Sequence, residues 1–287
     1  MRKLRAALTP YALIFPGSVW LAIFFVVPTV VMLSLSLQSG NVSDGFVFTW
    51  NWQSYIDGLT NYHDQIVRSL VYGLAATLIQ ILIGFPVAYW IAFKGGRNKS
   101  FYLFLVLLPF LVSFVLRTIS WQFLLSDNGM LLGPLKNIGL LPEDFRILAT
   151  PYAVIGGLAY NFLPFMILPM YVALERIDPR VLEAAQDLYA GKVQTFVRVV
   201  LPLSLPGVFA GVLMTFVPAS SDYVNASVLG GTKTTMIGNV IQNQYLVTQD
   251  YPTAAALSFT LMALLLVGIF SYAKALGTED VLEVAAR

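Results

Sequence analysis

The stretch FYLFLVLLPFLVSFVL, which runs from Phe101 to Leu116, decides the class of fold. It contains no charged residue, and it belongs to a chain of 287 residues that is 57% hydrophobic and only 11% charged. Soluble globular domains carry about 25% charged residues. A helix that crosses the hydrocarbon core of a bilayer needs about 20 mainly apolar residues. The stretch and the composition together predict an all-α integral membrane protein.

Further apolar stretches of similar length lie on either side of it. The six expected spans are 11–37, 67–93, 101–125, 151–174, 203–219 and 253–276. The first follows the basic segment MRKLR, but its apolar run is longer than the core of a signal peptide, and no small-residue cleavage pattern follows. We therefore expect a retained first span and a single membrane domain, with six transmembrane helices over residues 1–287.

The basic residues of the connections predict the orientation, because cytoplasmic connections are enriched in Lys and Arg. One side carries twelve of them, namely Arg2, Lys3, Arg5, Lys94, Arg97, Lys99, Arg176, Arg180, Lys192, Arg198, Lys274 and Arg287. The opposite side carries three, namely Lys136, Arg146 and Lys233. This asymmetry predicts that both termini are cytoplasmic, and that the connection 175–201 is cytoplasmic as well.

The sequence offers little material for catalysis by the chain itself. It has no cysteine and a single histidine, His63, whereas protein zinc sites need several ligands. The segment GGTKTT, residues 230–235, resembles a phosphate-binding loop only superficially, because Thr232 separates Gly231 from the lysine. We expect no metal, no cofactor and no ATPase site on this chain, with membrane lipid around it and no nucleic acid partner.

The cytoplasmic connection contains VLEAAQDLYAGKVQTFVRVVLPLSLPG, residues 181–207. Asp178 and Pro179 predict a helix start just before it, because the carboxylate accepts free N–H groups and proline suits the first helical position. Gly191 predicts the end of this helix, since glycine readily takes a left-handed conformation. A second short helix then leads to Pro202. The apolar face comprises Val181, Leu182, Ala185, Leu188 and Tyr189, and then Val193, Phe196, Val197 and Val200.

Two interpretations fit such a pair of short amphipathic helices. Either they cover the protein's own helix ends, or they form a docking site for another protein. The segment resembles the EAA loop of binding-protein-dependent ABC import permeases, whose pattern is Glu-Ala-Ala, three residues, glycine, nine residues and Ile-x-Leu-Pro. The corresponding residues are Glu183, Ala184, Ala185, Tyr189, Val199, Leu201 and Pro202. The spacing is kept, but Tyr189 replaces the glycine, and Gly191 is expected to make the turn two residues later.

This resemblance implies the type I ABC importer permease fold and a multi-pass location in the bacterial cytoplasmic (inner) membrane. It implies that the loop is a coupling helix, which sits in a cleft of a cytoplasmic ATPase subunit and transmits its closure. Glu183 would then pair with a basic group of that subunit. The implied partners are a second permease subunit in a heterodimer, two ATPase subunits that bind the ATP, and an extracytoplasmic substrate-binding protein.

Two further stretches, 150–178 and 221–246, resemble spermidine/putrescine permeases, which implies polyamine transport by alternating access. Asp222 lies where the fifth span meets the outside, with Tyr223 beside it. A carboxylate with aromatic faces suits an ammonium group, because cation–π contacts contribute about 0.5–2 kcal/mol. We therefore place Asp222 and Tyr223 on the substrate path, together with Tyr160, Asn161 and Trp121. The alternatives for Asp222 are a capping role or full solvation, and for the aromatic residues the alternative is ordinary packing.

Arg117, within the third span, argues against a polycation, because a fixed cation repels one. We expect it to pair with a carboxylate or with helix-end carbonyl groups, or to act in a gate. If it met the substrate instead, an anion such as sulfate would be favoured, and a sugar also remains open on the same scaffold. A stand-alone channel or secondary transporter and a membrane enzyme are remote alternatives, because few charges lie within the spans.

Overall fold

The computed structural model describes residues 13–275, which form two compact units. The described part of unit 1 comprises residues 13–63 and 241–262, and that of unit 2 comprises residues 64–240 and 263–275. Residues 11 and 12 of the first expected span and residue 276 of the last lie outside the described residues. So do four of the basic residues used for the orientation, namely Arg2, Lys3, Arg5 and Arg287.

Unit 1 begins with an apolar helix over Leu13–Ser36, which contains a π-helical turn, η1 (Ala22–Val26), and α2 (Val27–Ser36). A hairpin of β1 (Gln38–Asn41) and β2 (Gly45–Phe48) follows, and then α3 (Gln53–Asn61). The π-helical turn η6 (Gln244–Thr248) and the first part of α14 (Tyr251–Ala275) complete the unit.

The hairpin is a departure from the all-α expectation. Its strands pair antiparallel, with Gln38 opposite Phe48 and Asn41 opposite Gly45. The turn is held by Asn41, whose Oδ1 accepts the backbone N–H groups of Ser43 and Asp44 at 2.9 and 2.8 Å. Asparagine side chains bond to backbone groups two or three residues ahead in this way, which competes with helix formation. This local chemistry forms a short hairpin without changing the helical class of the protein.

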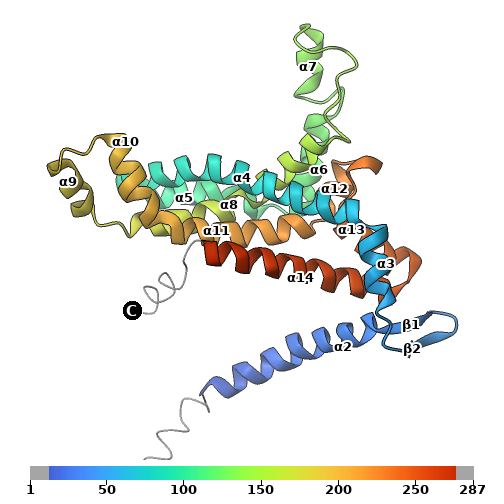
Figure 1. Cartoon of the computed structure of the whole chain (residues 1–287). Coiled ribbons are helices and arrows are strands. Elements are labelled where there is room, and N and C mark those ends of the chain that lie inside the picture. Colours follow the sequence, from blue (N-terminus) through green and yellow to red (C-terminus); the bar gives the residue numbers. More distant parts are fainter. Residues whose placement is uncertain (1–12, 276–287) are drawn as a thin grey trace, which may run out of the picture. The chain divides into compact units, whose positions relative to one another are not determined.

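Unit 2 contains the remaining helices, with most of α4, the first part of α13 and the end of α14. The α-helices are α4 (His63–Lys94), α5 (Lys99–Leu107), α6 (Phe114–Leu125), α7 (Leu132–Asn137), α8 (Pro151–Glu175), α9 (Pro179–Asp187), α10 (Lys192–Thr195), α11 (Leu201–Ser221), α12 (Val224–Val228) and α13 (Ile237–Asn243). The other helical turns are η2 (Gly96–Asn98), η3 (Leu108–Leu111), η4 (Phe196–Val200) and η5 (Thr232–Thr234). Figure 1 shows α4, α8 and α11 side by side, with α9 and α10 at one end and α6, α7 and α12 at the other.

Five helices of the described residues are long and apolar enough to span a membrane, and the third expected span makes six if its two halves are counted together. That span is not the continuous stretch expected from 101–125. Gly96–Leu111 and Phe114–Leu125 meet at an angle of 86°. Val112 and Ser113 are extended at the bend, directly after the 3-10 turn that contains Pro109. At 1.5 Å per residue, α5 and η3 are shorter than the ~30 Å hydrocarbon core, and the bend turns α6 away from their direction.

Close packing of α8 against α11 forms the centre of unit 2. A β-carbon at Gly207 would lie 2.5 Å from the Cβ of Ala173 and 2.6 Å from the carbonyl oxygen of Pro169. The absence of a side chain at Gly207 therefore permits this close approach. The buried residues packed around the end nearest α9 are Phe85, Ala88, Ala92, Met166, Ile167, Met170, Leu174, Ile177, Val200 and Val208. This cluster forms the base on which the α9–α10 segment rests.

Candidate functional site

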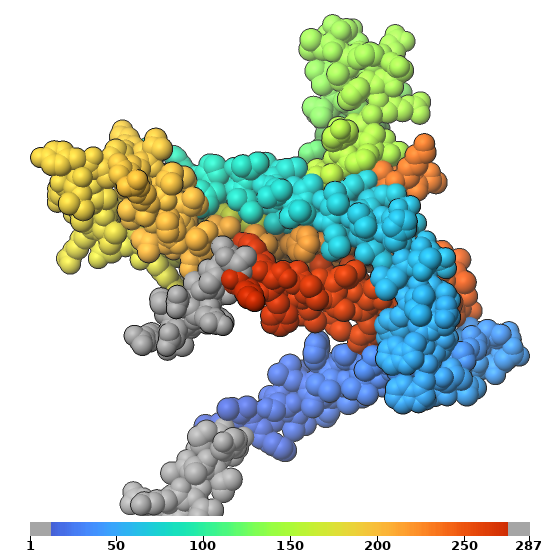
Figure 2. All heavy atoms as spheres, in the orientation of Figure 1, coloured from blue at the N-terminus to red at the C-terminus, as the bar shows by residue number. Residues whose placement is uncertain are grey.

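The α9–α10 segment projects from one end of unit 2, as the space-filling view in Figure 2 shows. Its first helix begins as the sequence predicts, because Oδ1 of Asp178 accepts the N–H of Arg180 at 2.9 Å and Pro179 occupies the first helical position. Its second part is fixed by Phe196, whose ring packs edge-on against Phe85 and Tyr89 at 5.7 and 5.9 Å between centroids. The base of the segment is therefore anchored to unit 2.

The turn between the two helices is made by Tyr189, and the prediction that Gly191 makes it is wrong. Tyr189 has φ of +58°, in the left-handed region, whereas Gly191 has φ of −66° and caps the start of α10. The N–H of Ala190 donates to the carbonyl of Ala185 at 3.0 Å, and the N–H of Tyr189 donates to that of Gln186 at 2.8 Å. These two bonds define a Schellman motif, in which glycine usually takes the left-handed place. The family spacing, not the nearest glycine, therefore fixes where the helix ends.

The apolar face expected for this segment is only partly buried. Ala185 and Val200 are buried, and Leu182 and Phe196 pack against the cluster beneath them. In contrast, Leu188 is 82% exposed, Tyr189 97% and Val193 77%. We call these three residues the apolar tip. Glu183 is exposed on the preceding turn, and Ala184 is exposed beside it, so the first two residues of the Glu-Ala-Ala motif face outward with the tip, whereas Ala185 faces the cluster beneath.

A buried polar cluster lies at the opposite end of unit 2, where α6, α8 and α12 meet. Nδ2 of Asn161 donates to Oγ1 of Thr118 at 3.0 Å and to Oδ1 of Asn225 at 3.0 Å. Asn225 in turn donates to Oδ1 of Asp222, from its backbone N–H at 2.7 Å and from Nδ2 at 3.2 Å. The resulting chain of hydrogen bonds joins three helices. It brings together Asn161 and Asp222, which the sequence had placed on the substrate path.

Asp222 follows the last residue of α11 and is only 8% exposed. Its bond to the N–H of Asn225 caps the short helix α12, which is the alternative that the sequence left open. Burial raises the pKa of the Asp222 carboxyl to about 6, against the smaller opposing effect of the hydrogen bonds from Asn225. A capping role and a place on the substrate path are compatible, and the latter stays a prediction.

Arg117 is 6% exposed in the first turn of α6. Its Nη1 lies 3.5 Å from the carbonyl oxygen of Asn161, and its guanidinium lies 5.7 and 5.8 Å from the ring centroids of Phe110 and Phe114. The expected carbonyl partner is thus present, although it belongs to the middle of α8 and not to a helix end. The bend places this cation on α6, beyond the break after Leu111.

The aromatic residues proposed for the substrate path lie beside the same cluster or at its edge. Trp121 and Tyr160 contact each other edge-on at 5.3 Å between centroids, and both are half-buried. Tyr223 is 44% exposed, and its carbonyl accepts a hydrogen bond from Asn239 at 2.8 Å.

The sequence analysis did not identify Thr118 and Asn225 as members of this cluster. The spacing of Asn225 three residues after Asp222 was the available signal, since a capping carboxylate bonds at that distance.

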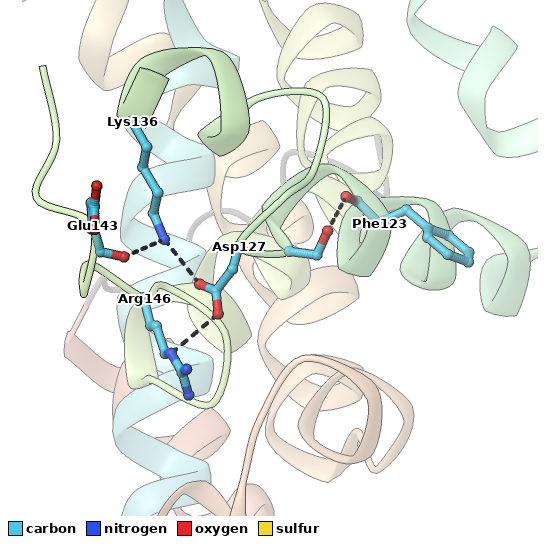
Figure 3. Close-up of polar contacts among 6 residues, drawn as sticks. Phe123, Asp127, Lys136, Glu143 and Arg146 are labelled. Carbon is cyan, nitrogen blue, oxygen red and sulfur yellow. Dashed lines mark hydrogen bonds and ion pairs between the residues drawn. The ribbon is translucent and has the colours of Figure 1, made fainter. Parts of the chain in front are cut away.

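The connection between α6 and α8 carries two of the three basic residues that the sequence analysis assigned to the side opposite the termini. Figure 3 shows Asp127 between them: its carboxylate lies 3.3 Å from Nζ of Lys136 and 3.1 Å from Nε of Arg146. Lys136 also donates to the carbonyl of Glu143 at 3.0 Å. Exposed ion pairs contribute little stability, but here one carboxylate offsets part of the positive charge at this end.

A chain with six apolar helical segments, counting the bent pair, and an EAA-type projection at one end is a transport permease subunit by architecture. It belongs to the family of binding-protein-dependent transport system inner membrane components, whose profile matches residues 67–275. The chain is therefore a multi-pass inner membrane protein. The family assignment confirms that the expected class of protein, a permease subunit without catalytic activity of its own, is correct.

Named relatives and solved structures agree with this assignment. The chain is 38% identical over 257 residues to the spermidine/putrescine transport system permease protein PotB of Haemophilus influenzae, covering 89% of this chain and 90% of that one. It is 37% identical to PotB of Escherichia coli, covering 84% and 88%, and 34% identical to the inner membrane ABC transporter permease protein YdcU of Escherichia coli, covering 77% and 74%. A bacterial ABC transporter that imports alginate matches with a TM-score of 0.69 at 20% identity, over 96% of this chain and 97% of that one. This last match confirms the type I importer permease fold.

Proposed function

We propose that the chain is the membrane-spanning permease subunit of an ATP-driven importer of polyamines such as spermidine and putrescine. It works with a second permease subunit in a heterodimer, with two cytoplasmic ATPase subunits and with an extracytoplasmic binding protein. The α9–α10 segment receives the movement of an ATPase subunit, and alternating access opens the path to each side in turn. Both termini and this segment lie in the cytoplasm under this proposal, as the distribution of basic residues predicts.

The observation that carries the transport mechanism is the α9–α10 segment itself. It projects from unit 2, it keeps Glu183 and Ala184 exposed, and its base is fixed by Phe196. A rigid projection transmits force to the helices behind it, because packed interiors deform little. The 38% identity to PotB supports polyamines as the transported solute.

The charges at the opposite end are compatible with a polycation. Asp222 supplies a carboxylate, and Trp121 and Tyr160 supply aromatic faces on α6 and α8, the helices that its hydrogen-bonded cluster joins to α12. The guanidinium of Arg117 faces two aromatic rings and a carbonyl oxygen, which spread its charge over neutral neighbours. The same contacts weaken the alternative of an anionic solute, for which Arg117 would have to face the path.

The test is the ATPase activity of the complete complex in lipid, with its binding protein. We expect spermidine and putrescine to stimulate hydrolysis, and sulfate, maltose and alginate oligosaccharides to leave it at the basal rate. Stimulation by sulfate alone would contradict the polyamine assignment and favour the anion alternative. For the coupling role, Glu183→Ala should abolish stimulation while the complex still assembles or should prevent its recovery. Normal stimulation in that variant would exclude Glu183 from the role.

A further inference from the structure

We infer that Tyr189 is a contact residue for the ATPase subunit: its ring enters an apolar pocket of that subunit, and Glu183 faces a cation at the rim of the pocket. This inference rests on the proposed function, because it assumes that an ATPase subunit docks on the α9–α10 segment. It adds Tyr189 to the surface that contacts the ATPase subunit; this residue replaces glycine in the family pattern and makes the turn between α9 and α10. The structure of the turn supplies the first argument.

Tyr189 occupies a backbone conformation that tyrosine rarely adopts. Its φ of +58° lies in the left-handed region, where a β-carbon crowds the following carbonyl group. Bulky side chains at such φ values are outliers, and glycine is the residue that the Schellman position favours. Both hydrogen bonds of the motif involve backbone atoms only. The tyrosine side chain therefore adds nothing to the turn that glycine would lack.

The side chain also makes no use of the rest of the described structure. It is 97% exposed, which leaves almost none of its ring surface against other residues. A strained residue persists where its side chain serves a function. An aromatic ring that neither stabilises its own turn nor packs within its own chain is available to a second protein. Tyrosine is also among the residues that contribute most at protein interfaces, because it buries a large rigid surface.

The surroundings of the ring define the chemistry of the partner. Leu188 and Val193 extend the exposed apolar surface on both sides of Tyr189. Glu183 and Asp187 are exposed on α9, and Lys192 is exposed at the start of α10. The matching surface is an apolar pocket with at least one cation at its edge on the α9 side. A bilayer headgroup region is a poorer match, since two of these three charges, Glu183 and Asp187, are acidic and would be repelled by its anionic lipids.

The first experiment measures the affinity of the purified ATPase subunit for the permease pair in lipid nanodiscs. Tyr189→Gly should raise the dissociation constant about thirty-fold. At 1.4 kcal/mol per tenfold change, this corresponds to about 2 kcal/mol of binding free energy. Its thermal stability should equal or exceed that of the wild type, because glycine relieves the left-handed strain. Tyr189→Phe should bind within about threefold of the wild type. Met130→Ala, an 84% exposed position at the opposite end, is the matched control and should bind normally.

A second measurement identifies what covers the ring. The chain has no cysteine, so Tyr189→Cys provides a single site for an environment-sensitive fluorophore. We expect its emission to shift to the blue on addition of the ATPase subunit and to stay unchanged when anionic vesicles are added. A shift with vesicles alone would show that the tip meets lipid, and it would overturn the inference.

The binding measurements distinguish a failure of this inference from a failure of the proposed function. If the ATPase subunit binds the wild type, Glu183→Ala weakens binding and Tyr189→Gly does not, the proposed function stands and the role of Tyr189 is refuted. If the ATPase subunit does not bind the wild-type permease pair at all, both are refuted.

Discussion

The cap on α12 provides a direct test of what Asp222 does. Oδ1 of Asp222 accepts hydrogen bonds from the backbone N–H and from Nδ2 of Asn225, and Asn225 is fully buried. Asp222→Ala removes this acceptor and leaves the buried N–H unsatisfied, which costs about 2 kcal/mol. Asp222→Asn keeps an oxygen at the same place, so its cost should stay within about 1 kcal/mol.

The assay is the apparent melting temperature of the permease in detergent, at pH 7.5. For a chain of this size, about 2 kcal/mol corresponds to a decrease of about 4–8 °C for Asp222→Ala. Asp222→Asn should melt within about 4 °C of the wild type. If the two variants melt together, the capping role is refuted. Polyamine uptake by Asp222→Asn then tests the other role, because a stable variant that transports at the wild-type rate would remove the carboxylate charge from the substrate path.

Comparison of the wild type with Asp222→Asn also predicts how the melting temperature depends on pH. Burial raises the pKa of the Asp222 carboxyl from 3.8 to about 6, so the folded state favours the protonated form. The contribution of this pKa shift to the free energy of unfolding is fully present below pH 4 and is lost as the pH rises through about 6. The melting temperature of the wild type relative to Asp222→Asn should therefore rise as the pH falls from 8 to 5. An unchanged or opposite difference would show that the carboxyl is well solvated.

Two further predictions concern the base of the α9–α10 segment and the helices behind it. Gly207→Ala places a methyl group against Ala173 and the backbone of Pro169, so we expect a loss of about 1–3 kcal/mol and a lower melting temperature. Gly156→Ala, also within a helix but with no atom within 4 Å of the new group, is the control and should be neutral or stabilising. Phe196→Ala should accelerate hydrogen exchange over residues 192–200 and destabilise the protein by about 2–3 kcal/mol, since its ring packs on two aromatic neighbours. Equal exchange rates in that variant and in Val197→Ala, whose side chain is 50% exposed, would refute the anchoring role of Phe196.

Much of the fold could be read from the sequence because membrane spans depend on composition over a long window. The stretch 151–174 was expected as a span, and α8 covers Pro151–Glu175. The start of α9 was also predictable, because Asp178 and Pro179 act within one helical turn. Pro109 was a signal for the bend after Leu111, but prolines also lie within other spans, where membrane helices tolerate them, so the sequence did not show that this one precedes a sharp break.

The candidate site shows the same division. The spacing of Glu183, Leu201 and Pro202 identified the α9–α10 segment, because a local motif can be recognised from one chain. Placing Asn161 on the substrate path did not reveal its partners. Thr118 lies 43 positions away in the chain and Asn225 64 positions away, so only the packing of α6 and α12 against α8 brings them together.

The sequence by itself determined the membrane class and the position of the EAA-type loop, because each depends on residues close together in the chain. The tertiary structure decided which residue takes the left-handed turn, which apolar side chains of the loop remain exposed and which polar groups share a cluster. The physical reason is that burial and hydrogen bonding are settled between helices. Tyr189 illustrates both parts: its position follows from the spacing, but its exposure depends on how α9 and α10 pack on unit 2.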